Sequence, residues 1–301
     1  MPVRKILSLS GGGCRGLFQA SFLKKLEERI DDDLHNVFDL IAGTSTGSIV
    51  GLAIALGIKT EEIEKMYLDN ACKIFPRRRL RFIKEFRRGP IYDQCELRGS
   101  LKSIFRRDKL RDVKTPVLIT ATKEHSYSHH IFSSHDSSND LELEAVDIAL
   151  ASSAAPTYFP PVKPSGRNNS FIDGGVWANS PSLIAVLYAK NVLGFNFDSL
   201  RVLSIDTGDF PRRDHTPVKE LRKYSLKTVK AMLDMFHQTQ SSFVNNYTKD
   251  LIGADQYKRI TFNIEKSLSL DNAMECIKHL PGIAETQAEE HMDEIIEFMK
   301  S

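Results

Sequence analysis

The sequence predicts an α/β fold of three layers, in which helices cover both faces of a mainly parallel sheet. Two observations support this prediction. A strand, a glycine-rich loop and a helix follow one another near the start of the chain, and a second strand, turn and helix end near residue 56. Strands that alternate with helices are typical of parallel sheets. The chain has 301 residues, 41% of them hydrophobic, which is enough for a large core.

The first unit is a strand followed by a glycine-rich loop. Residues 6–10 alternate between apolar and polar side chains, as a strand does, and a helical pattern begins after residue 16. Consecutive glycines expose backbone N–H groups without obstruction by side chains, which an oxyanion or a phosphate group requires. The loop therefore supplies six candidate oxyanion-hole residues: Gly11, Gly12, Gly13, Cys14, Arg15 and Gly16.

Two interpretations of this loop compete. The spacing of the glycines at 11, 13 and 16 also matches the fingerprint of dinucleotide-binding proteins, which expects an acidic residue about twenty positions later, at the end of the next strand. Here the next predicted strand ends in Ala-Gly-Thr-Ser, without an acid. We therefore favour an oxyanion hole that serves Ser45 from the neighbouring parallel strand, and a nucleotide-binding protein is the alternative.

The second unit has the form of a nucleophile elbow. A mostly apolar strand is predicted over residues 37–42 and an apolar helix over 46–56, with Gly43-Thr44-Ser45-Thr46-Gly47 between them. Glycine permits the sharp bend that lifts the serine hydroxyl away from the backbone. The start of the helix also directs N–H groups toward charge that develops near Ser45. The alternative is an ordinary turn rich in small residues.

A third motif offers a base for the serine. Residues 170–173 form a short predicted strand that ends in Asp173, and Gly174 and Gly175 follow it. The Asn-Ser-Pro sequence at 179–181 can then start a helix that is predicted to end near residue 193. Asp-Gly-Gly is also a common turn, so this motif is informative only together with the other two.

Together, these three motifs resemble the patatin-like phospholipases. The family carries a Gly-Gly-Gly-x-Arg-Gly loop, a Gly-x-Ser-x-Gly elbow and an Asp-Gly-Gly or Asp-Gly-Ala turn in this order, and here they begin at Gly11, Gly43 and Asp173. Residues 151–160 also look like the segment that the family places before the aspartate strand. The resemblance covers about residues 4–210 and implies a three-layer α/β/α patatin-like fold. One departure is Ser10, where the family often has aspartate.

The resemblance also implies the catalytic pair. Patatin-like enzymes use a Ser-Asp dyad, so Ser45 is the implied nucleophile and Asp173 the implied proton acceptor. A Ser-Asp-His triad is the alternative, since histidines lie downstream at positions 215, 237, 279 and 291. An α/β-hydrolase elbow follows several strands, whereas a single strand precedes this one, and we therefore favour the dyad. Asp206, at the end of a later predicted strand, is a rival base.

We expect a single domain over residues 1–301, because no linker, internal repeat or low-complexity segment divides the chain. The catalytic core is expected over about residues 4–210 and includes a strand at 200–206. The C-terminal region, about 211–301, is expected to add three further elements, namely a helix at 224–249, a strand at 255–263 and a closing helix at 281–299.

Charge and cysteine content restrict the partners and the location. The chain has 41 Lys and Arg and 39 Asp and Glu, a net charge of +2 that predicts no general attraction to DNA or RNA. Four widely spaced cysteines predict reduced thiols in a cytoplasmic setting. The N-terminal sequence predicts a core strand instead of a signal peptide, and the longest apolar run, residues 49–58, is too short to span a bilayer. We therefore expect a soluble protein with peripheral contact at the inner face of the membrane.

A basic segment, residues 77–88, is the candidate for that membrane contact. It carries seven basic residues and one acidic residue, with four apolar side chains interleaved at helical spacing: Leu80, Phe82, Ile83 and Phe86. Basic amphipathic segments bind anionic membranes, and each Arg or Lys near the surface contributes about 1 kcal/mol. A solvated helix face and an anion-binding site are the alternatives for this segment.

The sequence therefore predicts a serine hydrolase of the phospholipase A type that acts on membrane phospholipids without a cofactor or a metal. The alternatives are a nucleotide-binding protein and an inactive patatin-like binding module. Residues 74–78, Ile-Phe-Pro-Arg-Arg, and the C-terminal third resemble patatin-like effectors of bacterial antiphage defence, which implies activation by a cyclic oligonucleotide.

Overall fold

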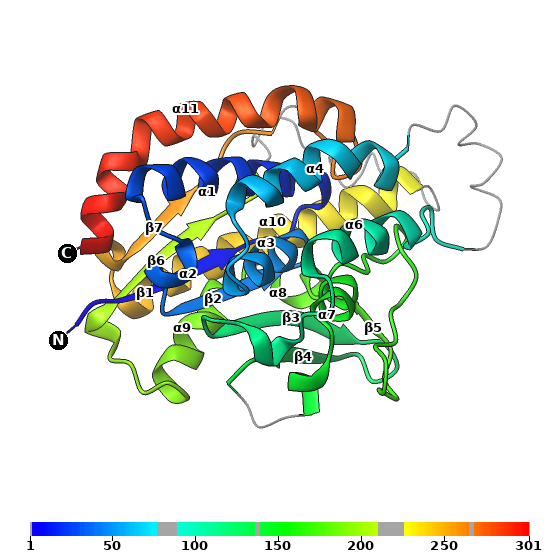
Figure 1. Ribbon diagram of the computed structural model, residues 1–301, viewed down its shortest axis with the longest axis horizontal. Helices are drawn as coiled ribbons and strands as arrows, with labels where there is room; N and C mark the ends of the chain where they lie inside the picture. The colour runs from blue at the N-terminus through cyan, green and yellow to red at the C-terminus, as the bar shows by residue number, and fades with distance from the viewer. Residues whose placement is uncertain (1, 77–88, 136–138, 210–225, 265–267, 301) are drawn as a thin grey trace.

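A computed structural model of the chain describes residues 2–76, 89–135, 139–209, 226–264 and 268–300. Within these ranges seven strands form one sheet in the order β4-β3-β2-β1-β6-β7, and β5 pairs with β3 beside this path (Figure 1). Five strands run parallel, whereas β4 and β5 pair antiparallel with β3. The strands are Arg4–Leu9 (β1), Leu40–Thr44 (β2), Val117–Lys123 (β3), Ser128–Ser133 (β4), Phe171–Asp173 (β5), Leu200–Ile205 (β6) and Tyr257–Ile260 (β7).

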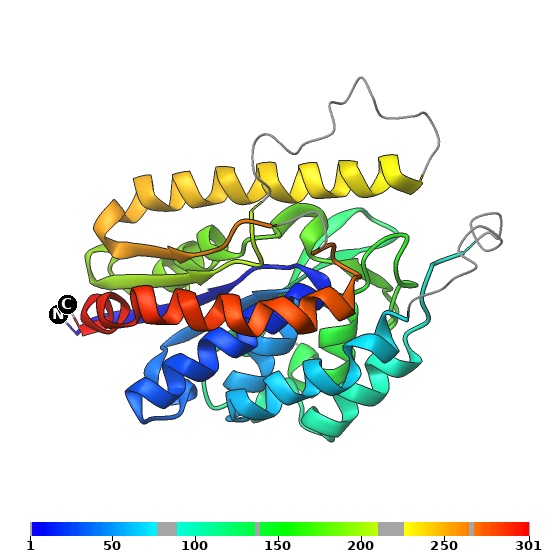
Figure 2. The same cartoon turned by 90° about the horizontal axis from the view of Figure 1, so that it is seen from above.

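Helices cover both faces of the sheet. Figure 2 shows α10 on one side of the strands and α1 with α11 on the other. α3 and α4 belong to the layer of α1, and α9 to the layer of α10. The helices are Gly16–Ile30 (α1), Leu34–Val37 (α2), Thr46–Ala55 (α3), Thr60–Ile74 (α4), Cys95–Phe105 (α6), Ala145–Ser152 (α7), Gly175–Ala178 (α8), Ser182–Asn191 (α9), Leu226–Ile252 (α10) and Ala273–Lys300 (α11).

The central strands are buried on both faces, which explains their mostly apolar sequences. In β1, Ile6 packs into the core that α9 covers, whereas Leu7 and Leu9 pack into the larger core beneath α1 and α3. Successive side chains of a strand point to opposite faces, so one strand contributes to both cores. This arrangement confirms the predicted three-layer fold with its mainly parallel sheet.

Three predicted boundaries were wrong. The strand predicted from residue 37 begins at Leu40, because residues 34–37 form α2, which buries Leu34. The helix predicted from residue 181 begins one residue later, and no side chain caps it. The helix predicted from Pro281 begins at Ala273 and continues through the proline. Cys276 and Leu280 are buried on the same helix, so packing outweighs the backbone hydrogen bond that a proline removes.

The C-terminal region contributes to the same sheet and core. β7 pairs with β6, and α11 packs along α1 with Leu280, Ala284 and Ile295 buried. The basic segment at 77–88 lies outside the described residues, and the membrane contact assigned to it stays a prediction. In the part of the chain that the structure describes, no helix combines the length and apolar character needed to cross a membrane.

Candidate functional site

Strand β3 brings two distant segments of the chain together. β2 pairs with the first half of β3, and its last residue, Thr44, lies opposite Thr120. β5 pairs antiparallel with the second half, where Asp173 lies opposite Ala121. Ser45 directly follows β2, so its side chain meets that of Asp173 at the end of the sheet although 128 positions separate them.

Ser45 has a strained backbone conformation at the start of α3. Its φ of 54° and ψ of −121° are rarely adopted by a residue that carries a Cβ, and such conformations cost about 1–3 kcal/mol. Neighbouring serines hold this conformation: the Ser45 N–H donates to Ser152 Oγ at 2.9 Å, and Ser48 Oγ donates to the Ser45 carbonyl at 2.6 Å. The turn therefore presents the hydroxyl of Ser45 in the manner of a nucleophile elbow.

The two glycines of the elbow allow α3 to start close to the sheet. A Cβ on Gly47 would lie 2.2 Å from the carbonyl oxygen of Leu9, at the end of β1. A Cβ on Gly43 would lie 2.4 Å from the carbonyl oxygen of Gly47. These distances are too short for any side chain, so the pattern Gly-x-Ser-x-Gly reflects close packing of three backbone segments.

Asp173 is buried beside Ser45, with 5% of its surface exposed. Its Oδ2 accepts the hydrogen bond from Ser45 Oγ at 2.6 Å, and its Oδ1 accepts one from the Gly175 N–H, also at 2.6 Å. Burial raises the pKa of Asp173 to about 6, although both hydrogen bonds act in the opposite direction. A carboxylate with this pKa is ionised at neutral pH and is a stronger base than an ordinary aspartate. The neighbouring Gly174 passes so close to β3 that a Cβ would lie 2.2 Å from Thr120 Oγ1.

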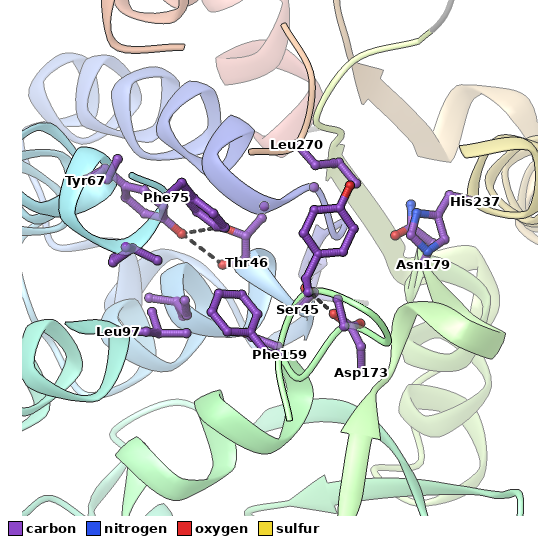
Figure 3. Close-up of a pocket in the computed structure, with 18 of the residues that line it drawn as sticks. Ser45, Thr46, Tyr67, Phe75, Leu97, Phe159, Asp173, Asn179, His237 and Leu270 are labelled. Carbon is purple, nitrogen blue, oxygen red and sulfur yellow. Dashed lines mark hydrogen bonds between the residues drawn. The ribbon is translucent and has the colours of Figure 1, made fainter. Parts of the chain in front are cut away.

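Ser45 and Asp173 lie at the edge of an apolar pocket of about 750 Å³ (Figure 3). Figure 3 shows the two side chains facing one another, with Phe159, Phe75 and Leu97 along the cavity beside them. α4 contributes much of the wall, and Tyr67 OH is hydrogen-bonded to Thr46 Oγ1 behind it. A pocket with such an apolar lining favours an apolar ligand.

The glycine-rich loop lies against the same pocket, but most of its N–H groups are already engaged. Four of the six donate to backbone carbonyls: those of Gly11, Cys14, Arg15 and Gly16. In this structure these four N–H groups are therefore not free to bind an oxyanion, and the oxyanion hole stays a prediction. The N–H groups of Gly12 and Gly13 have no acceptor among the described residues, and both residues line the pocket beside Ser45. The geometry thus leaves these two as candidate oxyanion donors.

Cys14 and Arg15 do not line this pocket and have other contacts. Cys14 Sγ lies 2.9 Å from Cys276 Sγ of α11, and burial raises the pKa of Cys14 well above its ordinary value. A buried thiol of this kind is a poor nucleophile. Arg15 is 5% exposed, and its Nε donates to the Gly12 carbonyl at 3.4 Å, which supports the loop from behind.

The alternative bases are not placed to act on Ser45. Asp206 forms an ion pair with Arg259 at 2.6 Å. His279 and His291 lie on α11, where they face glutamates of the same helix, and His215 lies outside the described residues. His237 of α10 does line the pocket, but the described contacts include no hydrogen bond from it to Ser45 or Asp173. Burial lowers the pKa of His237 to about 4, so it is neutral at physiological pH.

Two residues that the motifs do not identify complete the site. Asn179 follows the short helix α8, and its carbonyl accepts the Gly11 N–H at 3.0 Å, which fixes the glycine-rich loop beside the Asp-Gly-Gly turn. His237 reaches the same place from α10, more than sixty positions after Asp173. The sequence predicts Asn179 only as a residue at the start of a helix, because no local pattern indicates that α8 folds back onto the loop.

Comparison with protein families matches residues 7–186 to a family described as patatin-like phospholipase. A cGAMP-activated phospholipase of Vibrio cholerae is 34% identical over 67% of this chain and 62% of that protein. Patatin-like protein 2 of Arabidopsis thaliana is 31% identical over 80% of this chain and 70% of that protein. A cUMP-AMP-activated phospholipase of Escherichia coli is 27% identical over 69% and 65%. The matches thus span less than two thirds of the length of these bacterial relatives.

Proposed function

The chain belongs to the patatin-like phospholipase family, and we propose that it is a serine hydrolase that cleaves acyl esters of membrane phospholipids. The observation that carries this proposal is the 2.6 Å hydrogen bond from Ser45 Oγ to Asp173 Oδ2 at the edge of the apolar pocket. A fatty-acyl chain fits that pocket chemically, whereas the phosphates of a nucleotide would find few polar partners there. An inactive binding module would have no need for a strained serine beside a buried carboxylate.

In the first step, Ser45 Oγ attacks the ester carbonyl carbon while its proton moves to Asp173 Oδ2. The carbonyl oxygen becomes an oxyanion, and the free N–H groups of Gly12 and Gly13 stabilise its charge. The tetrahedral intermediate then collapses, and the bond between the carbonyl carbon and the glycerol oxygen breaks. Asp173 returns its proton to that oxygen, which leaves as the hydroxyl of a lysophospholipid, and the acyl group stays on Ser45.

In the second step, water hydrolyses the acyl-enzyme. Asp173, ionised again, takes a proton from the water while the hydroxide attacks the acyl carbonyl carbon. The oxyanion forms at the same two N–H groups, the bond to Ser45 Oγ breaks, and the proton on Asp173 moves to that oxygen. Fatty acid leaves, and the enzyme returns to its starting state. The residues of this chain account for each proton in the cycle.

The test measures fatty acid released from phospholipid vesicles by the wild type and by Ser45→Ala and Asp173→Asn. Each variant should lose activity by about 10³-fold or more, and the double variant should be hardly worse, because residues that act as one unit are not additive. The exposed residues Ser242 and Asp250 on α10 offer matched controls, Ser242→Ala and Asp250→Asn, which should retain wild-type rates. An Asp173→Asn protein that is folded and keeps more than about a tenth of the activity would refute the dyad.

We further propose that a cyclic oligonucleotide activates the enzyme. The support is the pair of bacterial relatives named as cGAMP-activated and cUMP-AMP-activated phospholipases. Vesicle hydrolysis should rise when either cyclic dinucleotide is added at micromolar concentration to the purified protein. Because the two names specify different nucleotides, each compound is tested separately. Equal rates with and without both compounds would contradict this part of the proposal and leave the dyad unaffected.

A further inference from the structure

Thr207 lies just beyond the end of β6 and contacts the glycine-rich loop. The residue is buried, with 2% of its surface exposed, and its Oγ1 donates a hydrogen bond to the Gly11 carbonyl at 2.6 Å. Gly12 packs on the same side chain, because a Cβ at Gly12 would lie 2.1 Å from Thr207 Oγ1 and 2.6 Å from Thr207 Cγ2. Thr207 therefore contacts both ends of the peptide unit that joins Gly11 to Gly12.

The same peptide unit lies beside the nucleophile. A Cβ on Gly11 would lie 3.1 Å from Ser45 Cβ, so the Cα of Gly11 packs against Ser45. The N–H of Gly11 donates to the Asn179 carbonyl at 3.0 Å, which fixes the start of the unit. Ser45 and Asn179 thus hold Gly11, and Thr207 holds the peptide group that follows it.

Peptide geometry then determines the direction of the Gly12 N–H. A trans peptide unit is planar, so its C=O and its N–H point in opposite directions, and the described chain contains no cis peptide bond. Because the carbonyl of Gly11 points toward Thr207, the N–H of Gly12 points away from Thr207. Gly12 and Ser45 line the apolar pocket, whereas Thr207 does not. The hydrogen bond from Thr207 therefore sets the direction of an N–H group in the pocket wall.

Thr207 is itself held by a buried ion pair. Its N–H donates to Asp206 Oδ1 at 2.9 Å, and Asp206 Oδ2 accepts hydrogen bonds from Arg259 Nη2 at 2.6 Å and Nε at 3.1 Å. A β-branched side chain also has few rotamers, so a fixed backbone holds the hydroxyl in one direction. Asp206 and Arg259, which take no part in the proton transfers, thus support the residue that contacts the loop.

We propose that Thr207 is a positioning residue for the reaction, whose hydroxyl orients the Gly12 N–H toward the oxyanion formed at Ser45. The proposal rests on the hydrolase function proposed above. During the attack of Ser45, negative charge develops on the ester carbonyl oxygen, and a donor that is already oriented stabilises this charge without reorganisation. The bound substrate carries little charge at that oxygen before the attack. Thr207 therefore affects kcat more than KM.

The test measures kcat and KM for p-nitrophenyl butyrate, with and without the two cyclic dinucleotides. Thr207→Val replaces the hydroxyl by a methyl group, and kcat should fall about 10- to 100-fold while KM changes less than about threefold. Thr207→Ser keeps the hydroxyl and should retain most of the wild-type kcat. Thr207→Ala removes the hydroxyl without placing a methyl group against the carbonyl, so it tests the proposal even if the valine variant does not fold. Its kcat should fall at least about tenfold.

Thr115 offers a matched control far from the site. Its Oγ1 also donates to the carbonyl of a distant residue, His35, at 2.6 Å, and Thr115 is likewise 2% exposed. Thr115 precedes β3, whereas Ser45 follows β2, so the two lie at opposite ends of these parallel strands. Thr115→Val should lower the free energy of unfolding about as much as Thr207→Val does and leave kcat unchanged.

A transition-state analogue separates the orientation of the N–H from a general loss of packing. An alkyl trifluoromethyl ketone reacts with Ser45 Oγ at its carbonyl carbon: the serine proton moves to Asp173, the carbonyl oxygen becomes an oxyanion, and no group leaves. The corresponding trifluoromethyl carbinol has the same alkyl chain and cannot form this adduct. Thr207→Val should weaken inhibition by the ketone about as much as it lowers kcat/KM, and should leave inhibition by the carbinol unchanged.

Three outcomes would overturn the positioning role of Thr207. They are a wild-type kcat in Thr207→Ala, an equal loss of inhibition by the ketone and the carbinol, and a loss of kcat in Thr115→Val as large as in Thr207→Val. A wild type that neither hydrolyses the ester nor forms the ketone adduct, with or without cyclic dinucleotide, would instead refute the proposed function itself. Mass spectrometry of the wild type with the ketone detects the adduct and distinguishes these cases.

Discussion

Ser45 and Asp173 are joined by a 2.6 Å hydrogen bond between a strained residue and a buried carboxylate. β3 creates this contact, since it pairs with β2 along its first half and with β5 along its second half. Because of this contact, the reactivity of Ser45 depends on the ionisation of Asp173. The strained backbone of Ser45 also lowers the stability of the fold. Both properties, and the role of the glycine-rich loop, can be tested by measurement.

Activity should fall in acid with an apparent pKa of about 6. Asp173 must be ionised to accept the proton of Ser45, and burial raises the pKa of this carboxyl to about 6. The kcat/KM for a soluble ester should therefore decrease about tenfold for each pH unit below 6. Initial rates between pH 4 and 8 check this prediction. A fall that begins near pH 4 would contradict the argument, because it would indicate a carboxyl with an ordinary pKa.

Asp173→Asn should stabilise the folded protein at pH 8 and have little effect near pH 4. The folded pKa of about 6 exceeds the ordinary value of 3.8, so folding is opposed once the carboxyl ionises. This cost is absent below about pH 4, grows between pH 4 and 6, and reaches about 3 kcal/mol above pH 6. Urea unfolding of both proteins at the two pH values measures the difference. A variant less stable than the wild type at pH 8 would show that ionised Asp173 stabilises the fold.

Ser45→Gly should be more stable than Ser45→Ala by about 1–3 kcal/mol, because glycine relieves the strain of the positive φ. Ser48 offers a matched pair of control variants inside α3, where Ser48→Gly should be less stable than Ser48→Ala by about 1 kcal/mol. The free energy of unfolding of the four proteins gives both differences. The same sign at both positions would argue against strain at the nucleophile.

Gly12→Ala should lower kcat by about 10²–10³-fold with a smaller change in KM, the effect of losing one oxyanion donor. A Cβ at this position would lie 2.1 Å from Thr207 Oγ1, so the loop must move and its N–H groups with it. Gly99→Ala is the control, since a Cβ on Gly99 of α6 meets nothing within 4 Å, and its kinetics should be those of the wild type. A Gly12→Ala enzyme that keeps a third or more of the wild-type kcat would show that the loop does not stabilise the oxyanion.

The elbow at Ser45 and the turn at Asp173 could be predicted from the sequence because short-range constraints define them. Gly47 can carry no side chain beside Leu9, and the apolar runs before and after the elbow show where a strand ends and a helix begins. Helix boundaries were harder to predict. Pro281 indicates the start of a helix locally, but buried residues on both sides of it extend α11 through that position.

The order of the strands and helices around the three motifs could be predicted from local sequence, because periodicity and glycine spacing are properties of neighbouring residues. The three-dimensional arrangement determines which N–H groups of the loop are free, since the carbonyls of Asn179 and Leu270, from distant parts of the chain, accept two of them. The same arrangement pairs Asp206 with Arg259 and not with Ser45, and it leaves the buried Oδ1 of Asn179 without a hydrogen-bond donor among the described residues. These features depend on which distant segments of the chain meet. Ser45 and Asp173 meet because β3 pairs with both β2 and β5.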